Sequence, residues 1–199
     1  MIDQITLFFG AVLLVVVSAM FVHSFLDKRR VRQHLSMLVP KLSGAVVGDN
    51  PFSYPRFEGY IQHRRCDFFL TVVKAGRRHI LYAVYSLQSA ITCDLLLLKT
   101  RFFKPAADEA SFAELGGAPV ASFPGYEVRS RNPETAHAAL KQGNIEAHLE
   151  GFSEFSSLQL GPDALVCAKP YEGWQDVSSE TITRHLMWLQ KLAEAMEQK

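Results

Sequence analysis

The 199-residue chain lacks the local signatures of common enzyme classes. It contains no G-x-x-x-x-G-K-[ST] loop, no G-x-G-x-x-G after a predicted strand and no G-x-S-x-G elbow, so neither nucleotide binding nor serine hydrolysis has local support. His63 and Cys66 have a spacing that would supply two metal ligands, but a closed structural zinc site needs four and no second pair follows. We therefore predict a non-catalytic protein with no cofactor and no metal.

Cysteine and net charge are also scarce. The three thiols, Cys66, Cys93 and Cys167, are widely spaced and form no C-x-x-C pair, which is more typical of a reducing compartment than of an exported disulfide scaffold. The formal net charge is +1. A dedicated nucleic-acid-binding protein normally keeps a net basic surface, so we expect no nucleic-acid partner.

The small net charge conceals an uneven distribution along the chain. Residues 1–40 carry four cations and two anions (+2), residues 41–104 ten and four (+6), and residues 105–199 seven and fourteen (−7), which sum to +1. A basic half beside an acidic half is one pattern of a protein with a face directed at anionic lipid or nucleic acid. The alternative is that the two halves neutralise each other inside one fold.

A long uncharged segment lies near the N-terminus. No charged side chain occurs from Gln4 to Leu26, and fourteen of residues 5–26 are Leu, Ile, Val or Phe. Each of these favours membrane insertion by about 0.3–0.6 kcal/mol, and a helix of this length matches the thickness of the hydrocarbon core. We predict a transmembrane helix over residues 5–26, in contact with the lipid bilayer.

The charges that flank this helix predict its orientation. Residues 1–4 carry no cationic side chain, whereas Lys28, Arg29, Arg30 and Arg32 follow the apolar run directly. A cleaved signal peptide has its positive charge before the apolar run, and cationic clusters stay on the cytoplasmic side. The sequence predicts a single-pass signal anchor in the inner (cytoplasmic) membrane, with a short non-cytoplasmic N-terminus and the C-terminal domain in the cytoplasm.

The rest of the chain predicts one α+β domain. The turn formers between Gly44 and Pro55 indicate that residues 27–51 are a basic juxtamembrane segment and linker, and that a cytoplasmic domain spans residues 52–199. β-branched and aromatic runs predict an antiparallel meander of four strands. These strands cover residues 56–62, 66–73, 80–87 and 91–98.

Helices and further strands follow the meander. We predict a short helix over residues 105–115 that ends at Gly116–Pro119, a strand over 126–131, helices capped by Asn132 and Asn144, and a hairpin from residues 158–160 and 164–168. The second of these helices carries Ile145, Leu149 and Phe152 on one face.

An amphipathic helix closes the chain. Its apolar stripe consists of Ile182, Leu186, Leu189, Ala193 and Met196, while Arg184, Lys191 and Glu194 take the opposite side, and Ser178 or Ser179 caps the helix. The stripe has two interpretations. It packs on the domain's own sheet, or it forms a seam for a partner helix.

One stretch mixes cations with aromatic rings. Lys99, Arg101, Phe102, Phe103 and Lys104 are candidates for contact with an anionic membrane surface. The alternative is that the two phenylalanines belong to the core and the cations are ordinary surface charge.

Two hypotheses about function follow. The first is a membrane-anchored, non-catalytic accessory or assembly subunit whose α+β domain binds partner proteins of a membrane complex. The second is a membrane-tethered sensor, or a module that binds a small ligand or lipid headgroup.

Overall fold

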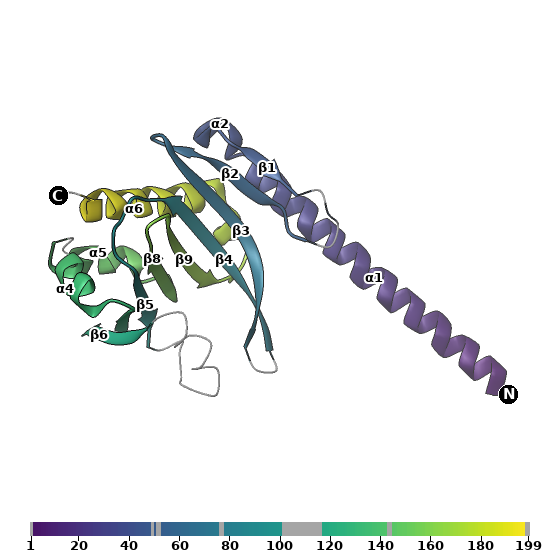
Figure 1. Cartoon of the computed structure of the whole chain (residues 1–199). Helices are drawn as coiled ribbons and strands as arrows, with labels where there is room; N and C mark the ends of the chain where they lie inside the picture. The colour runs from purple at the N-terminus through teal and green to yellow at the C-terminus, as the bar shows by residue number, and fades with distance from the viewer. Residues whose placement is uncertain are drawn as a thin grey trace.

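The computed structural model describes residues 2–48, 50, 53–75, 78–100, 117–142 and 145–197. These residues form an α+β domain from which one long N-terminal helix projects (Figure 1). The predicted fold class is confirmed. The strands are β1 (Ala45–Val47), β2 (Arg56–Ile61), β3 (Arg64–Ala75), β4 (Arg78–Gln88), β5 (Leu95–Lys99), β6 (Ala118–Phe123), β7 (Tyr126–Ser130), β8 (Ser157–Leu160) and β9 (Ala164–Pro170). The helices are α1 (Ile2–Ser36), α2 (Val39–Leu42), α4 (Pro133–Gln142), α5 (Ile145–Phe152), α6 (Ser179–Glu197) and the 3₁₀ helix η1 (Trp174–Val177).

All nine strands join one antiparallel sheet in the order β1-β2-β3-β4-β9-β8-β5-β7-β6. The first four follow one another as a meander, but β5 does not continue it, because β9 and β8 lie between β4 and β5. The predicted strand over residues 91–98 therefore begins late, at Leu95. Ser89 explains the detour: its backbone N–H donates to Asp163 O (3.1 Å) and its hydroxyl to Gly161 O (3.0 Å), so the chain after β4 passes the β8–β9 turn first.

The core lies on one face of the sheet. A continuous row of fully buried side chains crosses it from β2 to β7, and α6 lies over this face (Figure 1). The row consists of Phe57, Phe68, Tyr85, Cys167, Leu158, Leu97 and Val128. On the opposite face, Phe69, Tyr82 and Leu96 are only half-buried. Alternation along each strand thus separates an inner row from a partly exposed one.

The N-terminal helix belongs to the core at one end only. Within the described residues, one helix is long and apolar enough to cross a membrane, and its most apolar stretch has a mean hydropathy of 2.3 and no buried residue. Further along, Val31 and Leu35 of α1, with Leu38 and with Leu42 of α2, are buried in the domain core. The sheet also begins before residue 52. Strand β1 lies inside the segment predicted as a linker, and it pairs with β2.

The remaining predictions give mixed results. Helices α4 and α5 and the β8–β9 hairpin occupy the predicted segments, and Asn132 Oδ1 accepts a hydrogen bond from the Thr135 N–H at 3.4 Å. Strand β6 was missed, because Gly117 and Pro119 were interpreted only as the end of a helix. The predicted helix over residues 105–115 lies outside the described residues.

Candidate functional site

Helix α6 presents two different faces. Ser178 caps the helix by accepting a hydrogen bond from the Thr181 N–H at 3.2 Å. The apolar stripe predicted from its periodicity is turned into the core, where Ile182, Leu186, Leu189 and Ala193 are fully buried and Met196 is half-buried. The sheet of the same chain already covers this stripe, so its alternative interpretation as a partner-helix seam is corrected.

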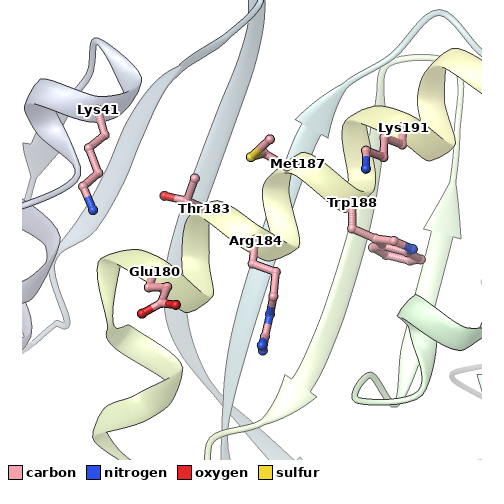
Figure 2. Close-up of a pocket in the computed structure, with 7 residues that line it drawn as sticks. All are labelled: Lys41, Glu180, Thr183, Arg184, Met187, Trp188 and Lys191. Carbon is pink, nitrogen blue, oxygen red and sulfur yellow. The ribbon is translucent and has the colours of Figure 1, made fainter.

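The outer face of α6 borders a shallow groove of about 590 Å³. Figure 2 shows Lys41 of α2 on one side of the helix and Trp188 on the other. The lining residues are Lys41, Glu180, Thr183, Arg184, Met187, Trp188 and Lys191. They combine three cations and one carboxylate with apolar surface, and the Met187 side chain is 50 % exposed. We call this surface the α6 groove.

Trp188 supplies a fixed aromatic wall of the groove. Its ring stacks on Phe155 (centroids 5.5 Å apart) and Phe152 (6.4 Å), and the backbone of Gly151 passes directly against it. A Cβ on Gly151 would lie 2.1 Å from the indole nitrogen, so only glycine fits without a displacement. The indole N–H is buried and has no acceptor among the described residues.

A cluster of charged side chains lies beside the groove. The Glu154 carboxylate contacts Arg184 Nη2 (3.1 Å), His185 Nε2 (3.3 Å) and Lys169 Nζ (3.5 Å). Lys169 is buried and also pairs with the buried Asp176 at 2.8 Å. Because these residues come from α6, β9, η1 and the turn before β8, the cluster ties the layers of the domain together.

The protonation of this cluster follows from its burial. Burial lowers the pKa of His185 to about 4, despite the opposing charge of Glu154, so the imidazole is neutral at pH 7. Burial would raise the pKa of Glu154, but the surrounding positive charges outweigh it and the net pKa is lowered. An ionised carboxylate beside a neutral imidazole is compatible with proton transfer. However, neither residue lines the α6 groove, and the geometry supports a structural role.

The predicted topology residues lie where α1 meets the domain. Lys28 Nζ lies 5.8 Å from the centre of the Tyr54 ring, and Arg32 Nη1 donates to Gly48 O at 3.4 Å. Arg29 and Arg30 are exposed. Arg29, although exposed, lines a small groove with Lys28, Arg32 and the segment that precedes β2, so three of the four cations lie at the joint between α1 and the domain.

Two further contacts at this joint were not predicted. The Tyr54 hydroxyl donates to Asp27 Oδ2 at 2.8 Å, and burial together with this bond raises the pKa of Tyr54. The His34 ring stacks on Trp174 of η1 with centroids 5.8 Å apart. The sequence carries only a general signal for these contacts, because Tyr54 and Trp174 are aromatic residues outside the long helices and strands.

The predicted membrane-surface stretch is only partly described. The Lys99 ammonium, at the end of β5, donates to the backbone carbonyl of Ser153 and is half-buried. Arg101, Phe102, Phe103 and Lys104 lie outside the described residues. Lys99 is not among the residues that line the α6 groove.

Comparison with known proteins gives one structural likeness. No family model matches the chain, and no curated protein matches it. The fold is similar to that in a crystal structure of the mycobacterial trehalose monomycolate transport factor A, TtfA, with a TM-score of 0.59 and 11 % sequence identity. The match covers 85 % of this chain and 96 % of that one. At this level of identity the likeness shows a shared fold.

Proposed function

We propose that this chain is a single-span, membrane-anchored accessory subunit without catalytic activity, whose α+β domain binds partner proteins of a membrane complex. The observation that carries the proposal is the division of α1 into an apolar part with no buried residue and a C-terminal part packed in the core. A continuous apolar surface of this size is unfavourable in water and favourable in lipid. The neighbour of similar fold is a transport factor, which fits an accessory role.

The cations after the apolar part support an orientation with the domain in the cytoplasm and the N-terminus across the inner membrane. Lys28, Arg29, Arg30 and Arg32 lie within the first two turns beyond residue 26. A fluorescent protein that folds only in the cytoplasm, fused after Lys199, should fluoresce, whereas alkaline phosphatase fused at the same position should be inactive. The reverse pair of results would contradict the orientation.

The α6 groove supports a partner with acidic and apolar side chains. Two of its three cations, Lys41 and Lys191, flank the apolar Met187 and the fixed Trp188 ring. Cations around apolar and aromatic side chains suit a partner that is both acidic and apolar. Partner binding can be tested in the full-length protein with a photo-crosslinking amino acid at position 187. A matched control at Lys141, exposed on α4, should not crosslink.

The outcome of this experiment separates two cases. A discrete adduct at position 187 that is lost in Lys41→Glu with Lys191→Glu supports the groove as the binding surface. Recovery of an uncrosslinked monomer from mild detergent, for both positions, would contradict the accessory-subunit proposal.

A further inference from the structure

The hairpin of β3 and β4 extends beyond the rest of the sheet. β2 pairs with β3 only as far as Phe68, and β9 pairs with β4 only from Tyr82 onward. Beyond these points β3 pairs only with β4, with Val72 opposite Leu81 and Val73 opposite Ile80. One further backbone hydrogen bond, from the Tyr171 N–H to Leu81 O (2.8 Å), holds the base of the hairpin. We call residues 72–75 and 78–81 the β3–β4 ribbon.

The ribbon combines exposed apolar side chains with positive charge. Val72 is 54 % exposed and Val73 is 39 % exposed, although they point to opposite faces of the hairpin. Lys74 and Arg78 are exposed, and no ion pair among the described residues involves either of them. The sequence contains no Asp or Glu between Asp67 and Asp94, so the ribbon itself carries no acidic side chain.

The contacts of α1 show the direction in which it leaves the domain. α2 lies beside Gly59, Arg32 reaches Gly48 at the end of β1, and Asp27 reaches Tyr54 before the start of β2. Going from α2 back along α1, the contacts move from the second half of β2 to the residues before its start. Toward its N-terminus, α1 therefore runs alongside β2 in the direction opposite to the chain of that strand.

Strand β3 runs in the same direction as this part of α1, because it is antiparallel to β2. Its six residues from Leu70 to Ala75 continue past the first residue of β2, which at about 3.3 Å per residue adds about 20 Å. Figure 1 shows the end of β3, the start of β4 and the N-terminal end of α1 projecting from the domain toward the same side. The apolar part of α1 begins just beyond the Asp27–Tyr54 contact, so a membrane crossed by this part would have its headgroups on the side toward which the ribbon extends.

We propose that the β3–β4 ribbon docks on anionic phospholipid headgroups of the leaflet from which α1 emerges. Lys74 and Arg78 bind headgroup phosphates, and Val72 and Val73 enter the interface between headgroups and hydrocarbon. The anchor holds the ribbon beside the leaflet, so weak binding by each residue is sufficient. This surface is separate from the α6 groove and rests only on the part of the proposed function that makes α1 a membrane anchor.

The full-length protein in lipid vesicles provides the test. A nitroxide label at Val73→Cys reports depth through its collisions with a water-soluble nickel chelate and with oxygen, and the native cysteines are buried and resist labelling. Vesicles of phosphatidylcholine are compared with vesicles that also contain phosphatidylglycerol. The matched control is Gln159→Cys. Gln159 is exposed and lies in β8, in the interior of the sheet between β9 and β5 and outside the β3–β4 ribbon.

We expect phosphatidylglycerol to lower the nickel accessibility at position 73 by about threefold or more and to leave position 159 unchanged. Lys74→Glu with Arg78→Glu should return position 73 to its value in phosphatidylcholine, and the pair of Gln substitutions should give an intermediate value. Equal accessibility in both lipids, or no effect of the double Glu variant, would overturn the proposal.

Flotation of the same vesicles after an alkaline wash separates this proposal from the anchor on which it rests. If the protein floats but position 73 stays accessible to water, the ribbon proposal is contradicted and the membrane anchor is not. Protein that is released by the wash contradicts the anchor.

Discussion

The C-terminal part of α1 is predicted to be indispensable for the stability of the domain. A fragment spanning residues 27–199 keeps Val31, Leu35, Leu38 and Leu42, whereas a fragment spanning 44–199 loses all four. These side chains are between 0 % and 7 % exposed. Burial of one Val or Leu side chain contributes about 1.5–3 kcal/mol, so the four together contribute about 6–12 kcal/mol. That sum is close to the whole stability of a typical domain, about 5–15 kcal/mol.

Urea unfolding followed by far-ultraviolet circular dichroism would measure the difference. Fragment 27–199 should unfold in one cooperative transition, and 44–199 should show none. Leu35→Ala in the longer fragment serves as a graded control and should cost about 2–5 kcal/mol. A cooperative transition of 44–199 with the midpoint of 27–199 would refute the view that α1 is part of the core.

Three further predictions concern the domain. Gly151→Ala should displace the Trp188 ring and cost about 1–3 kcal/mol, visible as a red shift of tryptophan emission and a lower urea midpoint. Glu197→Gln should weaken the two hydrogen bonds from Arg64 (2.8 and 2.6 Å) and cost about 1 kcal/mol or less at pH 7. The bond from Arg64 lowers the pKa of Glu197, so its contribution to stability is complete above the unfolded pKa and is lost as the pH falls through the folded pKa, and the difference from wild type should fade in acid. Burial lowers the pKa of His185 to about 4, so between about pH 6.5 and 4 the unfolded chain binds this proton and the folded chain does not. The free energy of unfolding should therefore fall by about 2 kcal/mol from pH 7 to 5. His185→Phe should reduce that fall, as measured by urea unfolding at each pH.

The parts of the fold with strong periodicity could be predicted from the sequence. The phase of α6 follows from the spacing of Ile182, Leu186 and Leu189, and the β3–β4 hairpin follows from two long β-branched and aromatic runs. In both cases a local pattern matches the surface that becomes buried. The position of β5 three places from β4 depends instead on contacts between Ser89 and the distant β8–β9 turn, which no local pattern encodes.

The core role of α1 was not predicted, although a signal for it exists. Val31, Leu35, Leu38 and Leu42 are spaced 4-3-4, which is the pattern of one helical face. The turn formers that follow led us to predict a linker over this segment, but they only shape the entry into β1. The outer face of α6 could not be identified as a groove either, because the groove also requires Lys41 from α2 and the close approach of Gly151 to Trp188.

The continuity of α1 determines how the domain lies relative to any bilayer that the helix crosses. A flexible linker over residues 27–51 would let the domain move about 25–30 Å from its anchor in every direction. In the structure Leu35 instead lies nine residues after Leu26 in one unbroken helix, a distance of about 14 Å at 1.5 Å per residue. Side chains of Asp27, Lys28 and Arg32 contact the domain along this distance. A helix without a break transmits its rotation as well as its height. If the helix crosses a membrane and the proposed partner binds the α6 groove, the groove would face that partner at one height and in one orientation, which would lower the entropy cost of binding.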